Sequence, residues 1–235
     1  MGDSKIYSAY IEPANLGLPE REYYLDQDDK AKGIRDKYHL YIKQLLTTEG
    51  GYKDGQAEEA ADNILLLERD LATHMMPKEE KRQIDKLYNP FTPEQLKEIM
   101  PDWNWTCFFE SMNIAVPSKG IVTEPAYFSF LNSYLNTVSI KNIKHYLKFC
   151  LIHAAAPYAH TSLEETHFDF YFKTLEGIEV MRPRKERLVR VINHSLGELL
   201  GQLFVSKHFP PQAKEVAIEM VKDIVDAFRD RINKL

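Results

Sequence analysis

Histidines are the first residues in this chain that could do chemistry, because imidazole binds metal ions and exchanges protons near neutral pH. His153, His160 and His167 recur every seven residues. A zinc-binding helix of the HExxH kind needs two histidines four residues apart, and no two histidines here have that spacing. Two helical turns separate such residues by about 10 Å, too far for ligands of one ion. The spacing argues against a metal site. Because Pro157 can break the helix, a metal-dependent enzyme using these three histidines remains an alternative.

Nucleophiles and paired carboxylates follow no catalytic pattern either. Ser195 lies in NHSLGELLG, which is not a GxSxG elbow and follows no predicted strand. The neighbouring acids Glu58 and Glu59, like Glu164 and Glu165, point in different directions on a helix, so we expect them in solvent. The chain has no glycine-rich nucleotide loop. We therefore predict no catalytic, cofactor-binding or metal-binding residue in this chain.

A basic segment, RPRKERLVR at 182–190, begins a predicted helix, where positive charge opposes the helix dipole. Its cations are Arg182, Arg184, Lys185, Arg187 and Arg190. They either bind carboxylates of a peptide or a neighbouring domain, or form a solvent-exposed face paired with acids one turn away. Further along, Gly197 and Gly201 allow another helix to approach closely. Glu198 between them is either buried beside an arginine or exposed.

Two aromatic clusters, at 102–109 and 168–172, lack the basic groove of a stacking platform for nucleic acid, so we expect them in the core. N-glycosylation triplets begin at Asn104 and Asn193. Such triplets are frequent by chance, and Asn193 falls inside a predicted helix.

Composition excludes further classes of protein. The net charge of −5 and the pI near 5.9 argue against nucleic acid as a partner, which requires a basic surface. No apolar run is long enough for a membrane span, and the first residues do not read as a signal peptide. Cys107 and Cys150 have no metal-ligand spacing, and their apolar surroundings favour buried free thiols over a single disulfide.

The elements that must position these residues are amphipathic helices, because apolar residues recur at spacings of three and four. Long helices are predicted at 31–47, 55–76, 139–156, 184–207 and 211–234. Shorter helices fit 78–88, 92–99, 104–112, 124–135 and 161–174. The apolar stripe of the third long helix is formed by Ile140, Ile143, Leu147, Leu151 and Ala154. We therefore predict an all-α fold, a single domain of many helices with one short extended N-terminal segment.

Helix starts are marked by capping patterns. Thr92, followed by proline and then Gln95, predicts a capping box. Ser162 with Glu165 is a second such pattern, and Thr123 before Glu-Pro predicts another start. The Pro210-Pro211 pair should end one helix and open the next.

The N-terminal segment raises a question about missing structure. Residues 5–12, KIYSAYIE, alternate like a strand, and the only strand of a chain leaves its backbone groups unpaired. The loop that follows, NLGLPEREYYL at 15–25, is more apolar than an exposed loop should be. The last helix runs to Leu235 without a cap. We therefore expect both ends to continue in a longer protein.

Five stretches together resemble one family, the neprilysin and endothelin-converting-enzyme zinc metallopeptidases, including bacterial PepO-like enzymes. They are LGLPEREYYL (16–25), LYNPFTPEQL (87–96), VTEPAYFSFL (122–131), FDFYFKTLEG (168–177) and the segment from RPRKERLVR to FPPQAK (182–214). The resemblance covers essentially the whole chain. Lys185 departs from it, because many relatives carry a tryptophan between the basic residues.

The resemblance implies that this chain is a fragment, the helical second lobe of a metalloendopeptidase that cleaves peptides and small polypeptides. The family's HExxH helix, acidic zinc ligand and Asn-Ala motif lie beyond the last residue here. Zinc is thus expected in the parent enzyme and not in this chain, which alone should be inactive. The implied partners are the missing catalytic lobe and peptide substrates. Family members are membrane-anchored, lipid-anchored or secreted, and some bacterial ones are cytoplasmic, so the compartment is not decided.

The resemblance also divides the chain into two parts. Residues 1–25 should form the junction with the missing lobe, and residues 26–235 the helical cap. In the family the strand before LGLP pairs with one further upstream, which is missing here. We therefore expect the LGLP loop to be covered only partly by its own helices. The alternative function is a free-standing helical module that binds a peptide or a protein.

Overall fold

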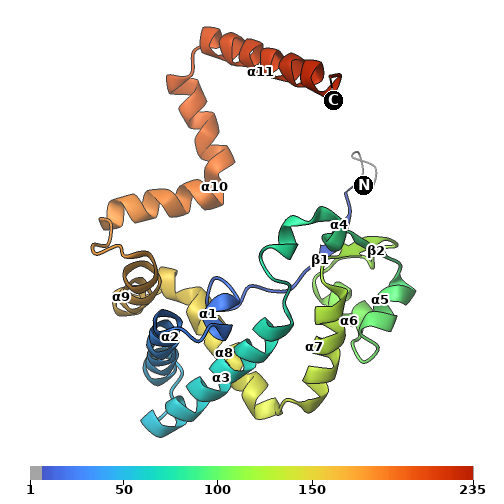
Figure 1. The fold of residues 1–235 in the computed structure, drawn as a ribbon. Coiled ribbons are helices and arrows are strands. Elements are labelled where there is room, and N and C mark those ends of the chain that lie inside the picture. Colours follow the sequence, from blue (N-terminus) through green and yellow to red (C-terminus); the bar gives the residue numbers. More distant parts are fainter. Residues whose placement is uncertain (1–6, 235) are drawn as a thin grey trace. The chain divides into compact units, whose positions relative to one another are not determined.

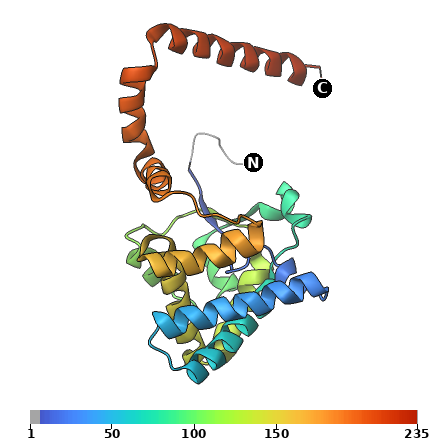
Figure 2. The ribbon, with the colours of Figure 1, turned by 90° about the vertical axis from the view of Figure 1, so that its left-hand side faces the viewer.

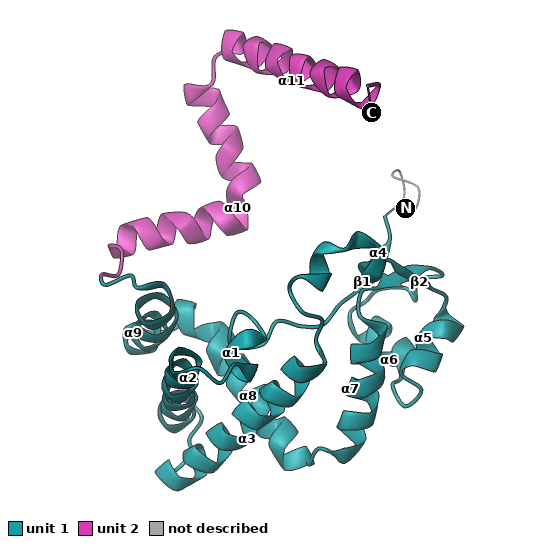
Figure 3. Cartoon of the chain, viewed as in Figure 1, with its two compact units in different colours: residues 1–179 teal, residues 180–235 magenta. Residues whose placement is uncertain are grey.

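The computed structural model describes residues 7–234, and most of them are helical (Figure 1), which confirms the predicted fold class. The chain divides into two compact units between Glu179 and Val180 (Figure 3), a boundary that the sequence pattern did not indicate. Each unit is described by itself below. Within residues 7–234, no helix combines the length and the apolar content that crossing a membrane requires.

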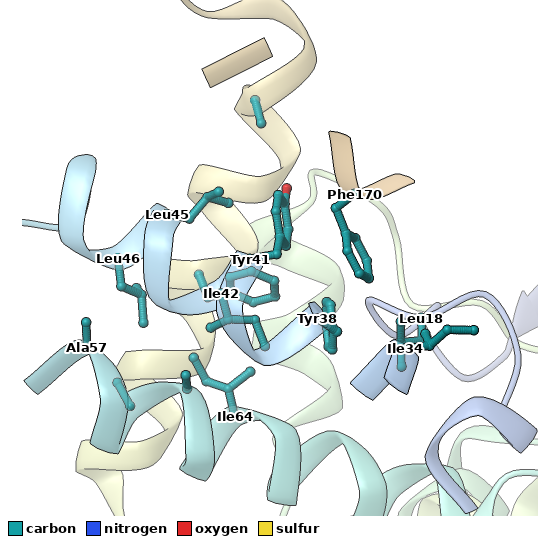
Figure 4. Packing of buried hydrophobic residues seen from close by; sticks show 14 of the residues in the cluster. Leu18, Ile34, Tyr38, Tyr41, Ile42, Leu45, Leu46, Ala57, Ile64 and Phe170 are labelled. Carbon is teal, nitrogen blue, oxygen red and sulfur yellow. The ribbon is translucent and has the colours of Figure 1, made fainter. Parts of the chain in front are cut away.

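Two long helices, α2 (Asp29–Thr48) and α3 (Asp54–His74), form the centre of the first unit and pack against each other. The Asp28 carboxylate caps α2 by accepting a hydrogen bond from the backbone N–H of Ala31 at 2.8 Å. Ile42 from α2 and Ile64 from α3 point toward each other in the core (Figure 4). The predicted stripes of both helices are therefore confirmed as buried faces.

Further elements close this core around α2 and α3 (Figure 2). They are α1 (Glu22–Leu25), α8 (Ile140–Ala155), η2 (Ala156–Tyr158), α9 (Thr161–Phe168) and the π-helix η3 (Asp169–Leu175). Phe149 of α8 and Phe170 of η3 are buried and supply much of its aromatic packing. The second aromatic cluster therefore reaches the core only in part, since Phe172 is 38% exposed.

The stripe predicted for α8 is wrong, because most of it faces solvent. Ile140 is 70%, Leu147 59% and Leu151 73% exposed, whereas Phe149 is 1% exposed. The helix carries apolar residues on two faces, so spacing alone does not identify the buried one. The face with the larger rings packs against α2 and α3.

A second core lies between the C-terminal half of α3 and three helices, α5 (Pro93–Ile99), α6 (Trp105–Ser111) and α7 (Pro125–Thr137). Two short elements, η1 (Glu80–Arg82) and α4 (Ile84–Leu87), connect α3 to this region. Phe109 of α6 is buried here, whereas Trp103 is 40% exposed. The first aromatic cluster is therefore only partly a core cluster.

The capping predictions had mixed outcomes. Thr92 does begin α5 with a capping box shared with Gln95. The box at Ser162 is wrong, because the N-cap of α9 is His160, two residues earlier, and the helix begins at Thr161. The start at Thr123 is one residue early, since α7 is preceded by Glu124.

The N-terminal strand has a partner within the chain, which corrects the expectation of an unpaired strand. β1 (Ala9–Ile11) pairs in parallel with β3 (Gly120–Val122), and β2 (Asn89–Phe91) pairs with β3 in antiparallel fashion. The order is β1-β3-β2, with Ala9 opposite Gly120. Lys5 and Ile6 of the predicted strand lie outside the described residues. The strands β2 and β3 are three residues each, too short to show a pattern of alternation.

The second unit consists of α10 (Arg184–His208) and α11 (Pro211–Ile232). The Pro210-Pro211 pair separates them as predicted. Non-helical backbone at Leu196, with φ −127° and ψ 24°, kinks α10 near its middle. No residue of either helix is buried, although both carry the predicted apolar stripes.

The sheet generates the first prediction, which concerns Gly120. A Cβ at this position would overlap the ring of Phe91 and lie 2.9 Å from the carbonyl oxygen of Ala9. We expect Gly120→Ala to lower the free energy of unfolding in urea by about 1–3 kcal/mol. The matched control is Gly33→Ala on α2, where nothing lies within 4 Å. It should stabilise the protein by about 0.5–1 kcal/mol. Equal urea midpoints for the two variants would contradict this account of β3.

Candidate functional site

The LGLP loop is held by a buried carboxylate, Glu68 on α3, which is 1% exposed. The backbone N–H of Gly17 donates to Glu68 Oε1 at 3.1 Å. The hydroxyls of Tyr24 and Tyr38 donate to Glu68 Oε2 at 3.0 and 2.8 Å. The hydroxyl of Tyr171, from η3, donates to the carbonyl oxygen of Gly17 at 2.7 Å. These five residues, the Glu68 cluster, join the loop to α1, α2, α3 and η3.

Burial controls the protonation of this cluster. It raises the pKa of Glu68 to about 7, although the hydrogen bonds from Tyr38, Gly17 and Tyr24 act in the opposite direction. Burial and the charge of Glu68 raise the pKa of Tyr24 and Tyr38 well above the ordinary value. Both phenols therefore remain protonated donors at neutral pH.

Helices of the chain itself cover the LGLP loop in part. Leu18 is 2% and Tyr24 1% exposed, and Leu16, Tyr23 and Leu25 are partly buried against the same core. Glycine is required at position 17, because a Cβ there would overlap the hydroxyl of Tyr38. The chain's own helices α2, α3 and η3 therefore bury Leu18 and Tyr24, whereas the rest of the loop stays partly exposed, as expected.

The structure brings two of the three spaced histidines together. The helix α8 ends at Ala155, before Pro157, and the rings of His153 and His167 stack with centroids 5.6 Å apart. His153 Nδ1 is hydrogen-bonded to the hydroxyl of Tyr41 at 2.9 Å. His160 lies apart, with its Nε2 3.2 Å from Glu49 Oε1. Stacked rings do not direct their nitrogens at one ion.

The described residues do not fit a metal site elsewhere either. Between residues 7 and 234, no group of three or more His, Cys, Asp or Glu side chains is placed to hold an ion. Burial lowers the pKa of His153, and burial together with repulsion from His153 lowers that of His167 to about 4. Both rings are therefore neutral aromatic neighbours of Tyr41 at pH 7.

The remaining candidates lie apart from one another. Glu58 pairs with Lys43 at 2.8 Å, whereas Glu59 pairs with Lys141 at 2.5 Å, so the two carboxylates do point in different directions. Ser195 and Glu198 are exposed on α10.

The expectation of a buried Cys107 is wrong, because this thiol lies on the solvent face of α6. Cys150 is half-buried, and both cysteines are free.

The basic segment and the glycines of α10 are exposed or half-buried. Arg182 Nη1 lies 3.7 Å from Glu186 Oε2, a pair of the kind expected for a solvent-exposed helix face. Nothing lies within 4 Å of the position that a Cβ of Gly201 would take.

Asn104, the first residue of one N-glycosylation triplet, caps α6 through its side-chain oxygen, which accepts from the backbone N–H of Cys107 at 3.0 Å.

The second unit exposes many apolar side chains. Its stripes, which a helix normally buries against a partner, are exposed along both helices. Examples are Leu199 (60%), Leu203 (62%), Met220 (59%), Ile224 (55%) and Phe228 (65%). We call the exposed apolar residues of α10 and α11, of which these five are examples, the C-terminal apolar faces. The stripes were predicted from the sequence, but their exposure was not.

Glu68 is the residue that sequence reasoning missed. A signal was present, since an acid occurs four residues after Ile64 at a position where the buried stripe of α3 continues. A charged residue within an apolar stripe indicates a buried polar partner, which here is the pair of tyrosines.

Comparison with known proteins identifies relatives across the whole chain. A model of peptidase family M13 matches residues 1–235. Endothelin-converting enzyme 1 of Homo sapiens is 24% identical over 229 residues, which cover 96% of this chain and 30% of that protein. Membrane metallo-endopeptidase-like 1 of Homo sapiens is 25% identical over 246 residues, 99% of this chain and 31% of that protein. The chain therefore spans about a third of the length of these relatives.

Solved structures agree with these matches. The zinc metalloprotease Zmp1 of Mycobacterium tuberculosis, in complex with an inhibitor, is similar with a TM-score of 0.86 and 26% identity. The alignment covers 97% of this chain and 34% of that one. PepO of Lactobacillus rhamnosis has a TM-score of 0.77 at 16% identity over 96% of this chain and 35% of that one, which shows the fold alone.

The Glu68 cluster predicts an unusual dependence of stability on pH. The folded protein keeps the Glu68 proton up to about pH 7, whereas the unfolded chain releases it near 4.5. The unfolded state thus binds fewer protons in this range, and the contribution of Glu68 to the free energy of unfolding falls as pH rises from 4.5 to 7. Its size is up to about 3 kcal/mol. Glu68→Gln should remove this fall, as measured by urea unfolding at several pH values. The same pH slope in both proteins would contradict the assignment.

His167 predicts the opposite slope. Its folded pKa of about 4 lies below the ordinary value of 6.5, so the unfolded state binds more protons between these values. The contribution of His167 therefore falls as pH drops from 6.5 to 4. In the Glu68→Gln background, unfolding experiments should show stability rising with pH over this range, and adding His167→Gln should reduce the rise. The control is His194→Gln on exposed α10, and a rise reduced equally by the control would exclude this role of His167.

Proposed function

The chain belongs to peptidase family M13, and from this membership we propose that it is the helical lobe of a zinc metalloendopeptidase that cleaves peptides and small polypeptides. The observation that carries the proposal is the match of the family model to all 235 residues. The relatives named above are about three times as long, so their catalytic residues have room outside the matched part.

The proposal places the zinc chemistry outside this chain. Zmp1 is a zinc metalloprotease, but the residues described in this chain do not fit a zinc site. Among them, Ser162 Oγ lies 3.0 Å from His160 Nδ1, and His160 Nε2 lies 3.2 Å from Glu49 Oε1, but all three residues are exposed to solvent. We propose that zinc and the groups that activate water belong to the rest of the parent enzyme, where a bound zinc lowers the pKa of its water. This chain would then contribute no step of amide hydrolysis.

The role proposed for the lobe is to restrict the substrate by its bulk. A lobe of packed helices covers the catalytic lobe and admits only peptides and small polypeptides to the space between them. The Glu68 cluster supports this role, because buried hydrogen bonds between the loop and four helical elements keep the first unit rigid.

Two surfaces are proposed to meet the rest of the parent enzyme. We propose that residues 1–25 form the junction and residues 26–235 the cap. The edge strand β1 supports the junction, because its second edge has no strand partner among the described residues and its middle residue, Tyr10, is 58% exposed. The C-terminal apolar faces support a cap that packs against further parts of the parent enzyme, since amphipathic helices normally bury such stripes.

The test compares the 235-residue chain with the product of the complete reading frame of its gene, using a fluorogenic peptide and zinc analysis. We expect the complete product to bind one zinc and to hydrolyse the peptide, and the chain alone to do neither. Replacing the glutamate of the HExxH segment in the complete product by glutamine is the matched control, and should abolish hydrolysis. A reading frame that stops after Leu235, or hydrolysis by the chain alone, would refute the proposal. A reading frame that stops after Leu235 would favour a free-standing binding module.

A further inference from the structure

A small pocket beside the LGLP loop contains an arginine without a partner. The pocket has a volume of about 60 Å³. Its lining includes Arg21, Lys78 and Lys81. The Nε atom of Arg21 is inaccessible to solvent and has no hydrogen-bond partner. A buried donor without an acceptor is unfavourable, and a guanidinium is a more costly case because it carries charge.

The other charges around the pocket are already paired. Lys78 Nζ donates to Glu20 Oε1 at 2.7 Å, and Lys81 Nζ lies 3.2 Å from Glu124 Oε1. The second oxygen of Glu124 accepts from the backbone N–H of Met76 at 2.6 Å. Arg21 forms no ion pair among the described residues. The pocket therefore has one uncompensated positive charge.

These properties select the ligand. A guanidinium binds a carboxylate through two parallel N–H···O bonds. A volume of about 60 Å³ corresponds to roughly two water molecules, which suits a group as small as a carboxylate. Because Glu20 and Glu124 are close, a single negative charge is favoured over a phosphate dianion.

The rest of the lining suits the carbon chain that carries such a group. Leu16, Leu18, Pro19, Met75 and Met76 supply apolar surface around the pocket. A free acetate ion would leave most of this surface unused, whereas a peptide covers it.

We propose that this pocket binds a carboxylate of a peptide, either its C-terminal carboxylate or the side chain of an aspartate or glutamate. The guanidinium of Arg21 is the primary contact, and Lys78 and Lys81, each already paired with a glutamate, line the same pocket. The inference concerns only the first unit. It is independent of the proposed peptidase function.

The experiment follows the side-chain Nε–H signal of Arg21 by NMR in the full chain, which detects binding without altering the protein. Three N-acetylated hexapeptides of alanine and glycine serve as probes. The first has a free C-terminus, the second is amidated and contains one aspartate, and the third is amidated and neutral. We expect a saturable shift of the Arg21 signal with the first or the second probe and none with the third. The responding probe identifies the source of the carboxylate.

Variants separate a specific site from general attraction. The backbone N–H signal of Met76 reports binding in each protein. Arg21→Gln should weaken the affinity at least about tenfold. Arg82→Gln removes the same charge from a nearby exposed residue that does not line the pocket, and should change the affinity less than about twofold. No saturable shift of the Arg21 signal, equal binding of the neutral peptide, or equal loss in the two variants would overturn the proposal.

Discussion

A single buried carboxylate holds the first unit together. Glu68 is 1% exposed and accepts hydrogen bonds from a backbone N–H and two tyrosine hydroxyls. A carboxyl group in an apolar core is tolerated only when hydrogen-bond partners surround it, so the loop, α1, α2 and α3 must keep their positions together. The same packing requires glycine at position 17, because no side chain fits between the loop backbone and Tyr38. The apolar loop thus has its binding surface within the chain.

The two units differ in how far they complete their own packing. Residues 7–179 bury two apolar clusters and pair their short strands. Residues 180–234 bury nothing, although their helices have strong apolar stripes. Hydrophobic stripes of this kind contribute to stability only when they are removed from water. This contrast is one of the observations that support the proposed place of the chain in a larger enzyme.

Several titratable groups of the first unit take part in its packing. Its histidine pair is neutral at pH 7 and packs as two aromatic rings beside Tyr41. Glu58 and Glu59 are paired with lysines, and Glu68 accepts hydrogen bonds from buried donors. Arg21 differs from these groups, because this cation at the end of the apolar loop has a buried Nε without a partner and no counter-charge in the described chain. Unpaired charge at the edge of a satisfied core indicates a ligand from outside.

Sequence alone determined the family, the helical class, the buried faces of α2 and α3 and the capping box at Thr92. These depend on local spacing and on motifs read along the chain, which need no knowledge of neighbours. Tertiary structure decided which strand pairs with β1, which face of α8 is buried, and that His153 stacks on His167. The paired residues Ala9 and Gly120 of β1 and β3 are 111 residues apart in the sequence. It also made Glu68 the centre of the core. Each of these depends on which distant segments meet, and contacts between distant segments leave no periodic trace in the residues that form them.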